Sequence, residues 1–260
     1  MYDRLTDVLA ESLGGSVHVG YWDDAADPAS VARATERLTD LVADRLAIAP
    51  GGHILDVGCG NGKPGLHIAR RLDVRLTGIT VSTHQLGLAR AAVHTSDQDR
   101  VEFRLADATH SHFAPDTFDA AFAIESLLHM TERTTVLTEL ARVVRPGGRL
   151  VVADVLLRRP IEGDTRTVVD AITRLFEVVS VATEQEYRTQ LGETGWDIRE
   201  FVDIGENVRP VYRRMATAMR DLAASAPDDV RQQTLAGADL VEAFASLPEI
   251  GYVLITARRK

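Results

Sequence analysis

The chain is poor in cysteine, in basic residues relative to acidic ones, and in long apolar runs. Its single cysteine, Cys59, excludes an internal disulfide and fits a reducing compartment. Because 29 Lys and Arg residues stand against 38 Asp and Glu residues, the net charge is −9 and we expect no nucleic-acid partner. No apolar run approaches the ~20 residues of a membrane span, and no signal segment opens the chain. We therefore expect a cytoplasmic protein without a membrane partner.

A glycine-rich turn follows the most apolar short run of the chain. Residues 53–57 predict a buried strand, and Gly58, Gly60 and Gly62 then allow the backbone to turn sharply and to approach a ligand. Strand, glycine turn and helix in this order are typical of a nucleotide site, although a turn without a ligand is the alternative. The third glycine comes one residue too early for a dinucleotide fingerprint, and Asp56 precedes the turn. A nicotinamide cofactor is therefore not expected.

Strands and helices alternate along most of the chain, which implies an α/β fold with a parallel sheet and helices on both faces. The expected strands are 53–57, 74–79, 101–105, 118–124, 149–157, 196–204 and 251–257. The expected helices are 2–13, 28–47, one beginning near Pro64, 83–94, 134–144, a helical region over 164–195, 207–225 and 228–246. Arg145 to Gly148 is expected to close the helix before the fifth strand.

Extra helices after the fifth strand suggest a cap over the edge of the sheet where ligands of such folds bind. A purely structural insertion or a subunit contact is the alternative. We divide the chain into N-terminal helices and a lid (1–50), a cofactor-binding core (51–158), a helical cap and acceptor-binding region with a sixth strand (159–247), and a final strand (248–260).

Polar residues follow the second and third expected strands. Thr80 stands where nucleotide sites of this kind place a carboxylate for the ribose hydroxyls, so neutral groups must serve, and Ser82 and Gln85 are near enough to help. Asp107 can accept a hydrogen bond from an adenine amino group, while Ala108 offers a backbone donor to the ring. A capping or solvated aspartate is the alternative for Asp107.

Asp154 lies in an otherwise apolar strand, and an unpaired buried carboxylate costs several kcal/mol, so it should have a partner. His129 lies just beyond the preceding strand, 118–124. We expect an Asp–His contact that orients the imidazole as a general base, with a structural histidine as the alternative. Glu125 is closer to that strand and is expected to face the cofactor or to position the acceptor.

Two further pairs are less specific. The aromatic pair Tyr21 and Trp22 lies in an expected loop, and we count both among the cofactor-binding residues, closing over the cofactor, with covering of the core as the alternative. His110 and His112 have the spacing of a metal pair, but no cluster completes a site, so we expect no metal.

These motifs resemble those of the class I S-adenosylmethionine-dependent methyltransferases, and most closely those of actinobacterial natural-product O-methyltransferases of the rebeccamycin sugar type. The resemblance covers nearly the whole chain except the cap, around 160–245, which looks less alike. The shared runs are His18-Val-Gly-Tyr-Trp22, Leu55-Asp-Val-Gly-Cys-Gly60, Gly62-Lys-Pro64, Gly78-Ile-Thr80 with Ser82 and Gln85, Ala106-Asp-Ala108, Glu125-Ser-Leu127, His129-Met130, Arg142-Val143, Arg145-Pro-Gly-Gly148, Ala153-Asp154 and Gly251-Tyr-Val-Leu-Ile255.

The resemblance implies a Rossmann-like sheet of seven strands with the last one antiparallel, a helical cap over the acceptor pocket and no metal. It also implies that His129 and Asp154 support deprotonation of an acceptor hydroxyl. The family relative has two adjacent histidines here, whereas this chain has Leu128 before His129.

The leading hypothesis is methyl transfer from S-adenosylmethionine to a hydroxyl of a small specialised metabolite, with S-adenosylhomocysteine as the second product and His129 as the base. Transfer to nitrogen or carbon of a small molecule is one alternative. A noncatalytic nucleoside-binding or dimerisation protein is another, and the sequence leaves open whether the chain forms a homodimer.

Overall fold

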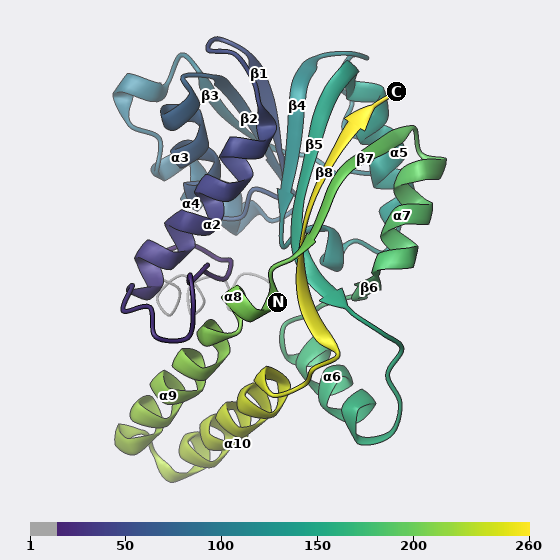
Figure 1. The fold of residues 1–260 in the computed structure, drawn as a ribbon. Coiled ribbons are helices and arrows are strands. Elements are labelled where there is room, and N and C mark those ends of the chain that lie inside the picture. The colour runs from purple at the N-terminus through teal and green to yellow at the C-terminus, as the bar shows by residue number, and fades with distance from the viewer. Residues whose placement is uncertain (1–14) are drawn as a thin grey trace.

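The computed structural model describes residues 15–260 and arranges them around one twisted sheet (Figure 1). Seven strands follow the order β3-β2-β1-β4-β5-β8-β7, and the short β6 pairs with β5. β1 to β5 run parallel to one another, while β8 is antiparallel to both β5 and β7. The strands are β1 His53–Val57, β2 Arg75–Thr80, β3 Val101–Leu105, β4 Phe118–Ile124, β5 Val144–Leu157, β6 Ala182–Thr183, β7 Trp196–Asp203 and β8 Ile250–Arg259. The expected Rossmann-like fold is confirmed, with one short strand more than expected.

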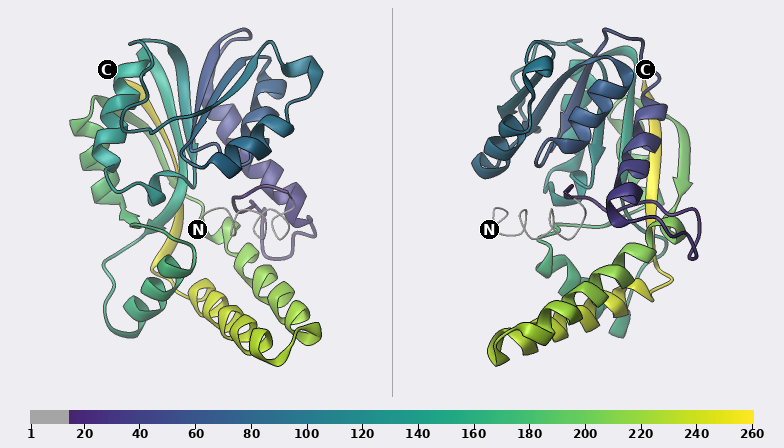
Figure 2. Two further views of the ribbon diagram at one scale, coloured as in Figure 1. Left: turned by 180° about the vertical axis from the view of Figure 1, so that it is seen from behind. Right: turned by 90° about the vertical axis from the view of Figure 1, so that its left-hand side faces the viewer.

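Helices cover both faces of this sheet (Figures 1 and 2). α2, α3 and α4 share one buried cluster with the sheet, and α5 and α7 share another on the opposite face. The helices are α2 Val31–Leu46, α3 Lys63–Leu72, α4 Thr83–Ala91, α5 Arg133–Val143, α6 Gly163–Leu175, α7 Glu184–Glu193, α8 Gly205–Val208, α9 Pro210–Ser225 and α10 Asp228–Ala245. Two short 3₁₀ turns, Thr95–Asp97 and Leu127–His129, complete the set in the described part of the chain.

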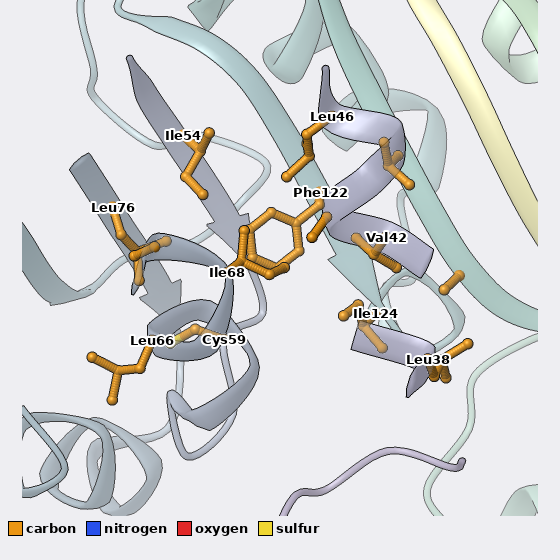
Figure 3. Close-up of a cluster of buried hydrophobic side chains, with 14 of the residues drawn as sticks. Leu38, Val42, Leu46, Ile54, Cys59, Leu66, Ile68, Leu76, Phe122 and Ile124 are labelled. Carbon is orange, nitrogen blue, oxygen red and sulfur yellow. The ribbon is translucent and has the colours of Figure 1, made fainter. Parts of the chain in front are cut away.

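The central strands are apolar on both sides because both faces are covered. Ile54 and Phe122 join the cluster under α2 and α3, while the adjacent Leu55 and Ala121 join the cluster under α5 and α7. Figure 3 shows the first cluster, in which side chains of α2 and α3 surround Phe122. This two-sided core fixes the register of the strands and therefore the positions of the loops at their carboxyl ends.

The cap consists of α6, α9 and α10, which share a third buried cluster. Figure 1 shows these helices at the end of the sheet where the parallel strands finish, and Figure 2 shows α9 and α10 side by side as a hairpin. In residues 15–260 no helix is long and apolar enough to cross a membrane.

Four expectations differ most clearly from the structure or lie outside it. The expected helix 2–13 lies outside the described residues. α2 begins at Val31, because Ser30 rather than Asp27 caps it by accepting a hydrogen bond from the Arg33 amide. β5 begins five residues earlier than expected, since Val144 already pairs with Phe118 before a register shift. The helical region 164–195 is interrupted after Leu175 by a loop, over residues 176–181, and by β6.

Candidate functional site

A cavity of about 590 Å³ lies where β1 to β4 end and the cap begins. Its walls come from the N-terminal segment, the loops after the four strands, and α6, α9 and α10. The lining includes Val17, Val19, Gly58, Gly60, Thr80 to Ser82, Gln85, Ala106 to Thr109, Ile124 to Ser126, Leu128 to Glu132, Val155, Ile172, Phe176, Val178, Val181, Tyr212, Met215, Val241 and Phe244. The structure thus brings most of the predicted site residues to one cavity.

The glycine loop forms one wall, and two of its three glycines line it. Gly58 has φ +75° and Gly60 has φ +52°, a region that disfavours side chains. A Cβ at Gly58 would lie 2.5 Å from Ser126 Cβ, and one at Gly60 would lie 2.7 Å from Val17 Cγ2. Gly62 does not line the cavity: it precedes α3 and packs against Phe103. We call this loop the glycine cradle, because a side chain at Gly58 or Gly60 would fill the space beside it.

A chain of neutral groups stands at the end of β2. The Thr80 hydroxyl donates to Gln85 Oε1 over 2.9 Å, and the Ser82 amide donates to Thr80 Oγ1 over 3.1 Å. Ser82 caps α4 by accepting from the Gln85 amide over 3.1 Å. Since all three residues line the cavity, they stand together where the ribose was expected.

Asp107 and Ala108 also line the cavity, after β3. Asp107 Oδ1 accepts from both the amide (2.8 Å) and the hydroxyl (2.7 Å) of Thr109. These bonds lower the pKa of the Asp107 carboxyl, so it is an ionised acceptor at neutral pH.

Asp56 is placed behind the cavity rather than in its wall. It is buried under the first turn of α3, where a Cβ at Gly65 would lie 2.7 Å from Asp56 Oδ2. That oxygen has no hydrogen-bond partner among the described residues. Burial raises the pKa of the carboxyl to about 8. Asp56 was expected at the cofactor, and the structure corrects this to a core position, because its side chain lies on the side of β1 that α3 covers.

The raised pKa of Asp56 predicts a pH-dependent stability. In the folded protein the Asp56 carboxyl keeps its proton up to about pH 8, whereas in the unfolded chain it releases the proton near pH 4. The free energy of unfolding therefore falls as pH rises toward 8. Asp56 alone is expected to lower the free energy of unfolding by up to about 1.4 kcal/mol per pH unit between about pH 6.5 and 8, and the raised pKa values of Asp154 and Glu125 act in the same direction. Near pH 6.5 the buried His18 partly offsets this fall, because burial lowers its folded pKa to about 4 while the unfolded imidazole still binds a proton there; the offset fades toward pH 8. When the free energy of unfolding is measured with urea at several pH values, it should fall less steeply with pH in Asp56→Asn than in the wild type. An equally steep fall would show that Asp56 does not have the raised pKa.

The aromatic pair lies in the core instead of over the cavity. Trp22 is fully buried, its ring nitrogen donates to the Ala29 carbonyl over 3.1 Å, and Arg214 stacks on its ring. Tyr21 packs against the same core, and neither residue lines the cavity. The alternative considered for this pair, that Tyr21 and Trp22 cover the core, is therefore what the structure has.

His129 reaches the cavity from the 3₁₀ turn after β4. Its Nδ1 lies 2.9 Å from the carbonyl oxygen of Glu177, a residue with φ +55° in the loop 176–181. A carbonyl oxygen only accepts, so Nδ1 carries the proton and Nε2 the lone pair of the neutral ring. Burial lowers the pKa of His129, which favours that neutral form.

Asp154 has the partner that its burial requires, but the partner is not the His129 ring. Its Oδ2 accepts from Tyr187 Oη over 2.9 Å and from the Leu128 amide over 3.1 Å. Burial raises the pKa of this carboxyl to about 7. The expected direct Asp–His contact is thus corrected: Asp154 faces α7, and it holds the backbone amide of Leu128, the residue before His129.

Glu125 lines the cavity with its backbone at φ +47°. Its Oε1 accepts from the Val19 amide and from Tyr252 Oη, each over 2.9 Å. Burial raises the pKa of Glu125 to about 7. This carboxyl therefore joins the N-terminal segment to β8 at the cavity wall.

Sequence reasoning missed Tyr187, Tyr252, Arg133 and the Glu177 carbonyl. Tyr252 stood in a run shared with the family, but nothing in the run assigned it a role. A backbone carbonyl has no residue signature at all. In residues 15–260 no group of three or more His, Cys, Asp or Glu side chains is arranged to hold a metal ion.

Comparison with known proteins agrees with this geometry. The family model described as "Methyltransferase domain" matches residues 55–152. O-methyltransferase resE of Aspergillus sclerotiorum is 40% identical, over 100% of this chain and 95% of its own. The 27-O-demethylrifamycin SV methyltransferase of Amycolatopsis mediterranei is 36% identical, over 99% and 95%. The crystal structure of the cyclase SpnF has a TM-score of 0.79 at 31% identity, over 100% and 93%. The chain belongs to the class I S-adenosylmethionine-dependent methyltransferases and, within them, to the natural-product O-methyltransferases.

Proposed function

We propose that this methyltransferase acts on a hydroxyl group of a neutral, largely apolar small molecule, with His129 as the general base. The observation that carries the proposal is the bond from His129 Nδ1 to the Glu177 carbonyl, because it leaves the basic lone pair on Nε2 of a residue that lines the cavity.

The lining of the cavity supports this class of acceptor. On the cap side, apart from Thr173, it is made of aliphatic and aromatic side chains. Among the described lining residues there is no Lys or Arg, while Asp107, Glu125 and Glu132 are acidic. A phosphorylated or carboxylated acceptor would need cationic or multiple charge-assisted donors, so this wall disfavours one.

The residues that would hold S-adenosylmethionine are those along the strand ends. Because Gly58 and Gly60 have no Cβ, the protein backbone of this loop can come close to the cofactor. Thr80, Ser82 and Gln85 offer neutral hydrogen-bonding groups for a ribose. The ionised Asp107 can accept a hydrogen bond from the amino group of the adenine ring. Once bound, the cofactor supplies an electrophilic methyl group.

The chain's own contribution is then alignment and proton removal. An apolar wall excludes water and aligns the acceptor hydroxyl with the methyl group. His129, neutral and held at Nδ1, accepts the hydroxyl proton at Nε2 as the oxygen attacks. Asp154 acts from behind, since it fixes the Leu128 amide and touches neither reactant.

Replacing His129 by alanine is expected to lower kcat by about 100-fold or more while the affinity for S-adenosylhomocysteine stays nearly unchanged. The assay measures S-adenosylhomocysteine release with a panel of hydroxylated polyketides and terpenoids, beginning with 27-O-demethylrifamycin SV, the acceptor named for one relative. His110→Ala, in the exposed loop after β3, is the matched control and should keep full activity.

Full turnover of a hydroxylated acceptor by His129→Ala would show that His129 is not the general base. Conversion of an acceptor without S-adenosylhomocysteine release would instead contradict methyl transfer. That second outcome has to be tested, because the similar structure SpnF is a cyclase.

A further inference from the structure

Leu128, the residue before the base, is held through both its amide and its carbonyl group. The Leu128 amide donates to Asp154 Oδ2 over 3.1 Å. The Leu128 carbonyl accepts from the amides of Val179 (2.9 Å) and Ser180 (3.2 Å). The loop 176–181, which also carries the Glu177 carbonyl, is therefore fastened directly onto the turn that carries His129.

Arg133 joins the two sides of this arrangement. It is the first residue of α5 and is only 6% exposed. Its Nη2 donates to both the carbonyl oxygen and the hydroxyl of Ser180, each over 3.0 Å. Its guanidinium also lies 5.3 Å from the ring centroid of Tyr187, whose hydroxyl donates to Asp154.

Burying the guanidinium of Arg133 costs free energy. Burial removes hydration from a permanent charge, and Arg133 Nε has no hydrogen-bond partner among the described residues. A well-packed apolar residue in such a place is often neutral or stabilising. What the arginine adds is geometric, since its Nη2 holds the carbonyl and the hydroxyl of Ser180 in place relative to α5.

The position of Arg133 separates this effect from ligand contact. Thr131, Glu132 and Val136 line the cavity, whereas Arg133 does not. A change at Arg133 can therefore reach the reaction through the loop 176–181 and His129, and not through direct contact with either reactant.

We propose that Arg133 is a positioning residue for His129: by holding Ser180 it keeps the Glu177 carbonyl on Nδ1 and so fixes both the orientation of the ring and its Nδ1–H tautomer. The catalytic value of this arrangement rests on the proposed function, in which Nε2 is the base. The tautomer itself does not rest on it, because the ring and the carbonyl are in contact whatever the reaction.

The test reads the tautomer directly. Protein labelled with ¹⁵N-histidine and saturated with S-adenosylhomocysteine is examined by long-range ¹H–¹⁵N correlation spectra, with the His129 signals assigned from His129→Gln. We expect the Nδ1–H form in the wild type and a mixture of both neutral tautomers in Arg133→Met. With an accepted acceptor, Arg133→Met should lower kcat by about tenfold, while KM and cofactor affinity change by less than about twofold.

Two further variants show whether the effect comes from the hydrogen bonds. Arg133→Lys keeps a donor near Ser180 and should restore part of kcat and of the Nδ1–H signal. Arg188→Met is the matched control, because Arg188 stacks on the Phe201 ring, 4.9 Å from its centroid, on α7 but away from the loop. It should leave the tautomer and kcat unchanged.

Ser180→Ala keeps the test decisive if Arg133→Met does not fold. It removes one of the two Nη2 bonds from an exposed residue and should produce a detectable Nε2–H fraction with a kcat lowered by about threefold. An Nε2–H ring in the wild type, or a wild-type tautomer and kcat in every folded variant of Arg133 and Ser180, would overturn the proposal. Loss of the Nδ1–H form in Arg133→Met together with full turnover by His129→Ala would support the role of Arg133 in positioning His129. It would also show that His129 is not the general base.

Discussion

Replacing Gly58 by alanine is expected to weaken S-adenosylmethionine binding by about 100-fold, or about 2.7 kcal/mol. Gly58 has φ +75°, and a Cβ there would lie 2.5 Å from Ser126 Cβ. Ser126 cannot retreat freely, because its hydroxyl donates to the Val57 carbonyl over 2.5 Å. The loop must move instead, and the amides of Gly58 and Cys59 that donate to the Ile79 carbonyl would move with it. Calorimetric titration with S-adenosylhomocysteine measures the loss.

Gly51→Ala is the matched control for this change. Gly51 has a similar φ of +80°, but nothing lies within 4 Å of the Cβ it would carry, and it is not part of the cavity wall. It should therefore lower stability by about 1 kcal/mol through backbone strain alone and leave binding unchanged. Wild-type affinity in Gly58→Ala would show that the glycine cradle does not hold the cofactor.

The fold could be predicted where local pattern and tertiary structure agree. Residues 101–105 and 118–124 form strands with the predicted bounds, because the first alternates buried Val101 and Phe103 with exposed residues, the second is almost continuously buried, and a loop follows each. The helical region 164–195 was predicted too long, since apolar spacing continues through the loop 176–181. That loop exists because the amides of Val179 and Ser180 bond to the Leu128 carbonyl, a contact between distant parts of the chain that periodicity cannot express.

The site divides in the same way. Residues after parallel strands could be predicted to meet, because a parallel sheet places its carboxyl ends along one edge, and Thr80, Asp107 and His129 do meet there. That the buried Asp154 needs a partner also followed from its surroundings. The identity of that partner did not, because the sequence does not show that Asp154 faces α7, where Tyr187 lies, while the His129 ring turns to a backbone carbonyl.

Replacing Asp154 by leucine is expected to lower the free energy of unfolding by about 3–5 kcal/mol, because it breaks a buried charged network from one side. Asp154 is fully buried and accepts from Tyr187 Oη and the Leu128 amide, which would both lose their acceptor. The nearby charge of Arg133, which lowers the pKa of Asp154 against the effect of burial, would lose its counter-charge.

Adding Arg133→Met to Asp154→Leu should therefore recover part of that loss, with a coupling energy of about 1–3 kcal/mol in a double-mutant cycle. Urea unfolding at about pH 8, above the pKa of about 7 at which Asp154 titrates, measures all four corners of the cycle with the carboxylate ionised. Arg188→Met, on the same helix as Tyr187, should combine with Asp154→Leu additively to within about 0.5 kcal/mol. If Arg133→Met also combines additively, then Arg133 and Asp154 are independent. In that case Asp154 on the Leu128 amide and the loop 176–181 on the Leu128 carbonyl would act separately, and the loop alone would fix the His129 ring.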